Sequence, residues 1–248
     1  MSVSAQWLEK YEAIKESLRC RTDLDSYFTQ EQIKGVRLGK VDLGMVRFPS
    51  GKVIACDPFI ELEDVQPFIQ SIDPGSYKVD LCIALYEQWG NRCACARLLV
   101  SDEKPVCYEM AMTGQENLDE EFDPDENAIF GFGVDAGMAC IADAGVQPAF
   151  SAWWGKRLEE DDSIDPYNDL FCDLLEESVR NMPQYQTEGG DWVKWEVPDS
   201  DCDLPVFASG FGDGYYAVYF GYDAGGKVCA VYVHFIDLYE DDEEDSDD

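Results

Sequence analysis

The stretch "YKVDLCIALYEQWGNRCACARLLV" (Tyr77–Val100) contains two runs of strand-forming residues on either side of a short polar segment. In the first run, strongly apolar residues occupy every second position from Val79 to Leu85, which is the period of a β-strand with one apolar face. The segment Glu87–Asn91 supplies turn residues, and Arg92–Val100 returns as a second strand. The stretch therefore predicts an antiparallel hairpin.

A second hairpin is predicted near the C-terminus, around "GYDAGGKV" (Gly221–Val228). This segment has the spacing of a phosphate-binding loop, with two glycines separated by four residues and a lysine after the second. A phosphate loop leads into a helix and has Ser or Thr after its lysine, whereas Val228 follows here and strand-like residues lie on both sides. Asp and Gly permit the positive φ of a hairpin connection. The pattern indicates a turn, not a nucleotide site.

The rest of the chain adds a few helices and further strands. Apolar residues recur at three- and four-residue steps over about residues 4–19, which predicts a helix. Two strands flank the turn Pro49–Gly51, and a second helix is predicted from Pro166, with Asp165 as its N-cap, to the stop at Pro183. Strand–helix–strand alternation is absent, so we expect an α+β fold of mostly antiparallel sheet with a few flanking helices.

The predicted domain organisation is simple. We expect a single domain over residues 1–238, because no internal repeat and no long linker divides the chain. Residues 239–248 are almost entirely acidic, and we expect them to form a disordered tail.

The chain is strongly acidic, with 52 Asp and Glu against 18 Lys and Arg and a net charge of −34. Such a charge repels nucleic-acid phosphates and anionic membrane surfaces, and it attracts basic proteins. A bland alternative is that the charge only maintains solubility. The N-terminus lacks an apolar targeting segment, and no run approaches the roughly 18 apolar residues of a membrane span. We therefore expect a cytoplasmic protein that binds neither nucleic acid nor membrane.

Cysteine and histidine usage argues against metal centres and disulfides. The ten cysteines are scattered, none form a Cys-x-x-Cys motif, and several lie in apolar strand-like runs, as expected for reduced core thiols. The Cys93-x-Cys95 pair lacks partners with ligand spacing. The one histidine, His234, lies in a predicted strand, so zinc sites with two or three histidines are impossible within one chain. We expect His234 to be structural or exposed, and we expect no cofactor or metal.

Two acidic segments start with the alternating oxygen ligands of a calcium loop. They are "DSDCDL" (Asp199–Leu204) and "DPDENA" (Asp123–Ala128). Both lack the glycine at loop position six and the glutamate at position twelve. They are predicted to be solvated acidic loops.

Five segments occur in the order of a known family. They are "GKVIACDPF", "GSYKVDLCIAL", "NRCACARLLV", "FGVDAGMACIAD" and "SGFGDGYYAVYFGYDAGGKVCAVYVHFIDL". Together they resemble the bacterial family catalogued as domain of unknown function 4241, over roughly Gly51 to Asp237. The resemblance implies a bacterial source and a mostly antiparallel α+β domain. It also suggests an association with toxin–immunity gene neighbourhoods. His234 departs from the acidic residue expected before Phe235.

The leading functional hypothesis is an interaction protein, similar to an immunity protein or antitoxin, that neutralises a basic toxin. Acidic carboxylates can take the place of substrate phosphates in a basic active site. A tight interface also needs a buried aromatic anchor, and Trp153 with Trp154 is the predicted one. The expected partner-binding residues of the tail are Asp241, Asp242, Glu243 and Glu244.

The alternative hypothesis is a hydrolase or a divalent-metal-binding enzyme built on clustered carboxylates. Its candidate catalytic residues are Asp57, Asp135, Asp143 and Asp213, each next to Gly, Pro or Ala in loop-like sequence. Paired carboxylates divide acid and base roles when their environments separate their pKa values, and oxygen ligands suit magnesium or calcium. A turn or cap role is the simpler interpretation of each residue.

Overall fold

The computed structural model describes residues 3–118 and 130–240. The central hairpin consists of β4 (Gly75–Tyr86) and β5 (Gly90–Leu99), which confirms the first prediction. Both faces of β4 are buried: Val79 packs into one hydrophobic core, and Cys82 packs into another on the opposite side. A strand of this kind must be covered on both sides, so the hairpin lies in the interior of a layered structure.

The larger sheet is antiparallel throughout and has eight strands. In spatial order it contains β1 (Gln32–Ile33), β2 (Val36–Phe48), β4, β5, β12 (Val228–His234), β11 (Gly214–Tyr222) and β6 (Cys107–Met110), with β7 (Phe132–Val134) also paired to β11. The segment between β11 and β12 is the predicted hairpin turn. Its Asp223 carboxylate accepts hydrogen bonds from the N–H groups of Gly225 at 2.7 Å and Lys227 at 2.9 Å.

The smaller sheet has four antiparallel strands, in the order β3 (Val53–Cys56), β8 (Met138–Asp143), β10 (Asp203–Ala208) and β9 (Trp192–Glu196). The turn Pro49–Gly51 connects β2 of the larger sheet to β3 of the smaller one. Gly51 has a φ of 70°, and a Cβ at this position would lie 2.1 Å from the Ile72 carbonyl oxygen, so only glycine fits the corner.

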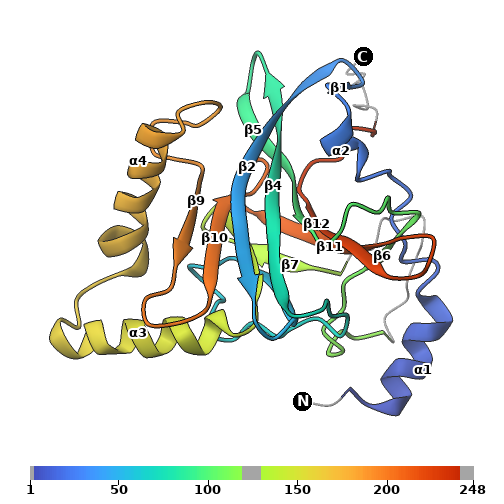
Figure 1. Ribbon diagram of the computed structural model, residues 1–248, viewed down its shortest axis with the longest axis horizontal. Coiled ribbons are helices and arrows are strands. Elements are labelled where there is room, and N and C mark those ends of the chain that lie inside the picture. Colours follow the sequence, from blue (N-terminus) through green and yellow to red (C-terminus); the bar gives the residue numbers. More distant parts are fainter. Residues whose placement is uncertain (1–2, 119–129, 241–248) are drawn as a thin grey trace, which may run out of the picture.

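Helices cover the two outer faces, which gives a helix–sheet–sheet–helix arrangement (Figure 1). α3 (Val146–Glu160), the π-helical turn η1 (Tyr167–Phe171) and α4 (Cys172–Asn181) pack on the smaller sheet. α1 (Ala5–Ile14), α2 (Ser26–Thr29) and the segment around Leu238 pack on the larger sheet. The inner faces of the sheets enclose a third core between them. The predicted α+β class is confirmed.

The helices differ from the predictions in two respects. α1 ends at Ile14 and does not continue to residue 19, because Ser17 donates both its N–H and its hydroxyl to the Ile14 carbonyl. α3 was not predicted, since its apolar residues are interrupted. Asp165 does cap the helical segment, and its carboxylate accepts from the N–H of Asn168 at 2.9 Å.

None of the helices in the described ranges is long and apolar enough to span a bilayer.

Candidate functional site

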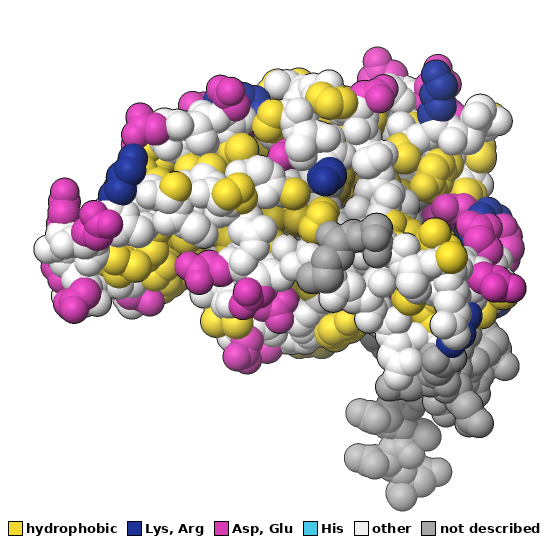
Figure 2. All heavy atoms as spheres, turned by 90° about the horizontal axis from the view of Figure 1, so that it is seen from below, with side chains coloured by type: hydrophobic (Ala, Val, Ile, Leu, Met, Phe, Trp, Pro, Cys, Tyr) yellow, Lys and Arg dark blue, Asp and Glu magenta, His cyan; other side chains and the backbone are white. Residues whose placement is uncertain are grey.

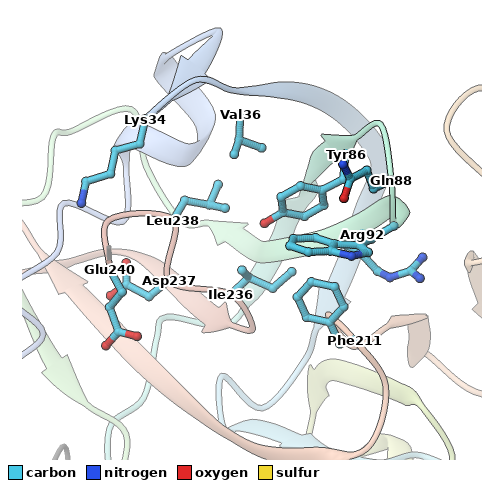
Figure 3. Close-up of a pocket in the computed structure, with 11 residues that line it drawn as sticks. Lys34, Val36, Tyr86, Gln88, Arg92, Phe211, Ile236, Asp237, Leu238 and Glu240 are labelled. Carbon is cyan, nitrogen blue, oxygen red and sulfur yellow. The ribbon is translucent and has the colours of Figure 1, made fainter. Parts of the chain in front are cut away.

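A cavity of about 800 Å³ lies where the β4–β5 turn, the start of β2 and the chain after β12 meet. We call it the aromatic cavity; its lining consists of Lys34, Val36, Tyr86, Gln88, Trp89, Arg92, Phe211, Ile236, Asp237, Leu238 and Glu240. Figure 3 shows the rings of Tyr86 and Phe211 on one side and the charged groups of Lys34, Asp237 and Glu240 on the other. Ile236 and Leu238 lie between the two sides. The cavity is therefore amphipathic.

Three aromatic rings form one wall of this cavity. The Tyr86 centroid lies 5.3 Å from that of Trp89 and 6.1 Å from that of Phe211, and Trp89 and Phe211 are 6.1 Å apart. Trp89 is 53% exposed and Phe211 is 58% exposed, which is unusual for large aromatic residues. The Arg92 guanidinium lies 5.7 Å from the Phe211 centroid. Clustered exposed aromatic residues of this kind mark interaction surfaces.

The opposite wall is fixed by a buried tyrosine on α2. The Tyr27 hydroxyl donates to the Ile236 carbonyl at 2.9 Å, accepts from the Leu238 N–H at 2.8 Å, and lies 3.0 Å from His234 Nε2. Burial lowers the pKa of His234, and the nearby Asp237 opposes this effect. His234 is thus a structural residue that helps to hold the C-terminal segment against the cavity.

A second, smaller cavity of about 180 Å³ adjoins the first one, and Arg92 and Phe211 line both. We call it the glycine-lined cavity, because Gly137, Gly210 and Gly212 form part of its wall. It lies between the two sheets, since β4 and β5 of the larger sheet and β9 and β10 of the smaller sheet all contribute lining residues, and loop residues complete the wall. The loops that supply the glycines belong to two of the segments that carry the family resemblance.

Two of the four candidate catalytic carboxylates are buried acceptors of backbone hydrogen bonds. Asp57 is fully buried and accepts from the N–H groups of Asp135, Ala136 and Phe59 at 2.7–3.0 Å. Asp143 is 1% exposed and accepts from Ser50, from the Gly51 N–H at 3.0 Å and from the Gly145 N–H at 2.8 Å. These contacts hold loops at the ends of β3 and β8.

The four carboxylates do not form one cluster. β3 and β8 are antiparallel and Val53 pairs with Asp143, so Asp57 lies about 13 Å further along the strands. The exposed Asp135 and Asp213 lie on the two loops that supply the glycines of the smaller cavity. Among the described residues, no group of three or more His, Cys, Asp and Glu side chains is arranged to hold a metal ion.

The tryptophans predicted as a partner anchor lie on α3, on the outer face of the smaller sheet, and line neither of the two cavities. Trp154 is 4% exposed and stacks on Phe150, so its indole is a core side chain. Trp153 is partly buried against Trp195, and the Arg157 guanidinium lies 5.2 Å from its ring. Asp241, Asp242, Glu243 and Glu244 lie outside the described residues, as do Asp123–Ala128.

Sequence reasoning missed both exposed aromatic residues of the cavity. Trp89 lies within the turn segment Glu87–Asn91, and Phe211 lies between two glycines in "SGFGDG". A large aromatic residue within a turn segment does not belong to a strand face that packs on a core. Its presence in such a segment could therefore have indicated an exposed aromatic residue.

The surface of the molecule reflects its acidic composition. Asp and Glu side chains are distributed over the face shown in Figure 2, with few Lys or Arg among them and hydrophobic side chains between them. All ten cysteines are free thiols, and seven of them are buried.

In comparison with known families, a model described as "protein of unknown function (DUF4241)" matches residues 46–233. No curated protein and no solved structure matches the chain. The matched range contains most of both sheets and the glycine-bearing loops, and it ends just before His234. Because this range is more than half of the chain, the protein belongs to the DUF4241 family.

Proposed function

We propose that this protein is a cytoplasmic interaction protein that binds a basic protein partner through the aromatic cavity, in the manner of an immunity protein or antitoxin that neutralises a basic toxin. The observation that carries the proposal is the pairing of exposed Trp89 and Phe211 with a strongly acidic surface. Aromatic residues in the centre of an interface provide most of the binding energy, while surrounding charges steer the encounter.

The cavity matches a basic partner on chemical grounds. Its aromatic wall offers ring faces to an aliphatic or cationic side chain, and Asp237 and Glu240 supply carboxylates on the opposite side. Lys34 donates to the Tyr239 carbonyl, and Arg92 donates to the Asn91 carbonyl at 2.9 Å, so both lining cations have contacts within the protein. The two cations and two anions of the lining cancel formally, so the long-range attraction of a basic partner comes from the net charge of the whole molecule, which is −34.

The structure offers less support for the alternative of a carboxylate-based enzyme. Asp57 and Asp143 accept hydrogen bonds from backbone N–H groups and lie about 13 Å apart along the paired strands, so these two residues do not form an acid–base pair. An interaction protein needs no such pair.

Surface plasmon resonance against the basic product of a neighbouring gene tests the proposal. Trp89→Ala and Phe211→Ala are each expected to weaken binding by about 30-fold or more, the loss typical of an anchor residue. Trp153→Ala is the matched control, because it removes an indole that lies on α3 and does not line the aromatic cavity, and it is expected to leave affinity unchanged. Loss of binding with Trp153→Ala and not with Trp89→Ala would place the interface on α3 instead.

A further inference from the structure

We propose that a groove beside the edge of the smaller sheet is a docking site for a basic, partly apolar segment of a protein partner: a Lys or Arg side chain with apolar neighbours. We call it the acidic groove; its lining includes the exposed Ile60, Glu61, Asp64 and Tyr215 and the buried Phe68 and Phe132. The groove has a volume of about 430 Å³ and shares no lining residue with the aromatic cavity. The inference therefore does not rest on the function proposed above.

The buried part of the groove belongs to the core between the two sheets. Phe68 and Phe132 are 8% and 6% exposed, and both pack in this core. β3 is an edge strand of the smaller sheet, and β7 of the larger sheet lies next to it, so the core reaches the surface at this side of the sandwich. A Cβ at Gly133 on β7 would meet no atom within 4 Å, which leaves this wall open. The volume is in the range of about 300–1,000 Å³ that is usual for ligand sites.

Two exposed apolar side chains border the groove, and the backbone holds both in place. Ile60 is 59% exposed and Tyr215 is 53% exposed. The Tyr215 hydroxyl donates to the Gly131 carbonyl at 2.9 Å and accepts from the Gly131 N–H at 3.2 Å, which fixes the ring. Ile60 lies in a turn in which the Glu61 N–H donates to the Asp57 carbonyl at 3.0 Å. Exposed apolar residues at a groove mark an interaction site, and their fixed positions reduce the entropy lost on binding.

The charges of the groove select a cation. Glu61 and Asp64 are the only charged residues among the described residues that line it, and both are exposed. Neither carboxylate has a hydrogen bond or an ion pair within the described part of the chain, so both can accept from a ligand. An anionic ligand would meet two like charges here and no cation. The aromatic cavity differs in this respect, because its lining contains two cations as well as two anions.

The two features together define the partner segment. A Lys or Arg side chain pairs with the exposed carboxylates, and its apolar neighbours cover Ile60 and the Tyr215 ring. The net charge of −34 attracts such a segment over a longer range.

Titration with three short peptides tests the proposal. The backbone N–H resonances of Gly131 and Gly133 report on the groove, and the indole N–H resonance of Trp89 reports on the aromatic cavity. N-acetyl-Leu-Arg-Leu-amide is expected to shift the two glycine signals, with a dissociation constant in about the millimolar range. N-acetyl-Leu-Glu-Leu-amide is expected to bind at least about tenfold more weakly, because like charges repel. N-acetyl-Gly-Arg-Gly-amide lacks the apolar neighbours and is expected to lose a similar factor.

Two results of this titration would overturn the proposal. The first is equal binding of the Arg and Glu peptides at the groove. The second is a shift of the Trp89 signal without any shift at Gly131 and Gly133. The second result would place the cationic peptide in the aromatic cavity, and the function proposed above would still stand.

A matched pair of double variants separates the groove from the net charge. Glu61→Gln with Asp64→Asn is expected to weaken binding of the Arg peptide about three- to tenfold. Glu159→Gln with Asp162→Asn removes the same charge from exposed residues around the end of α3, and it is expected to weaken binding less than about twofold. Equal losses would show that the net charge attracts the peptide and the groove carboxylates do not, which would contradict the proposal.

A further variant tests the apolar border. Ile60→Ser changes an exposed side chain, so the protein is expected to remain folded while the affinity for the Arg peptide falls about threefold or more. Unchanged affinity in this variant would show that Ile60 does not contact the peptide, and the docking site would then not be the acidic groove.

Discussion

Arg47 on β2 and Asp203 on β10 join the two sheets through a bidentate ion pair. Arg47 Nη2 lies 2.6 Å from Asp203 Oδ1, and its Nε lies 3.0 Å from Oδ2, which also accepts the Arg47 backbone N–H at 2.8 Å. Asp203 is 1% exposed, so the prediction of a solvated loop at Asp199–Leu204 is wrong for this residue. β10 begins at Asp203 and pairs it with Glu196, which places its side chain between the layers.

Replacing Asp203 with Asn should lower the free energy of unfolding by about 3 kcal/mol, because Arg47 would lose its charged partner at a half-buried site. Urea denaturation of the variant measures this loss. The control is Arg180→Gln, which breaks a 3.6 Å pair with Glu176 on the exposed face of α4 and should cost less than about 0.5 kcal/mol. Equal effects of the two substitutions would show that the Arg47–Asp203 pair stabilises the protein no more than an exposed ion pair does.

The single histidine makes one pH dependence easy to isolate. Burial lowers the pKa of His234 below its ordinary value of 6.5, so the unfolded chain binds this proton more readily than the native protein. The neutral form of His234 therefore adds to the free energy of unfolding. This contribution is complete above about pH 6.5, and it is lost as the pH falls toward the pKa of His234 in the folded protein. Between pH 7 and 5.5 the stability of the wild type should therefore decrease relative to that of His234→Gln. Parallel stability curves for the two proteins would contradict this expectation.

The cysteines should react slowly in the native protein. Burial raises the pKa of Cys20 and of Cys82 to about 11, and the Sγ atoms of Cys56 and Cys140 contact each other at 3.6 Å inside the small sheet. A thiol reagent at pH 8 attacks the thiolate, so few groups should react before unfolding. All ten should react in denaturant; a total well below ten would indicate a disulfide.

Substitution by asparagine should lower the stability of the protein at the buried candidate carboxylates and leave it nearly unchanged at the exposed ones. Asp143→Asn replaces an acceptor of several buried donors, so it should cost about 2–3 kcal/mol in a urea titration. Asp213→Asn changes an exposed loop residue and should have an effect within about 0.5 kcal/mol. A stability loss at Asp213 as large as that at Asp143 would point to a role for Asp213 that its exposure does not suggest.

Binding to a basic partner should depend on salt mainly through the association rate. Charges separated by more than a Debye length, about 8 Å at physiological salt, are largely screened, so added salt should slow association more than it changes dissociation. Deleting Asp241–Asp248 removes seven of the 52 acidic residues and leaves Glu240 in the cavity, so this truncated chain should lose on-rate and keep most of its affinity. An association rate that does not change with salt in surface plasmon resonance would indicate that the acidic residues maintain solubility and do not attract the partner.

The sequence alone determined the elements whose signals are local. The hairpins at β4–β5 and β11–β12 follow from alternating apolar residues and from turns rich in Gly and Asp, and the cap at Asp165 follows from one short segment. Each signal acts over a few residues, because side-chain alternation and positive φ are properties of the neighbouring backbone.

Only the tertiary structure decided which sheet each strand joins and which side chains meet. The strands flanking Pro49–Gly51 look like a hairpin in sequence, yet they lie in different sheets because a corner at Gly51 separates them. Trp89 and Phe211 are adjacent in space although more than a hundred residues separate them in the chain. Their exposure, like the burial of Trp154, depends on whether a segment distant in sequence covers the side chain. The residues next to each position in the sequence do not indicate which segment that is.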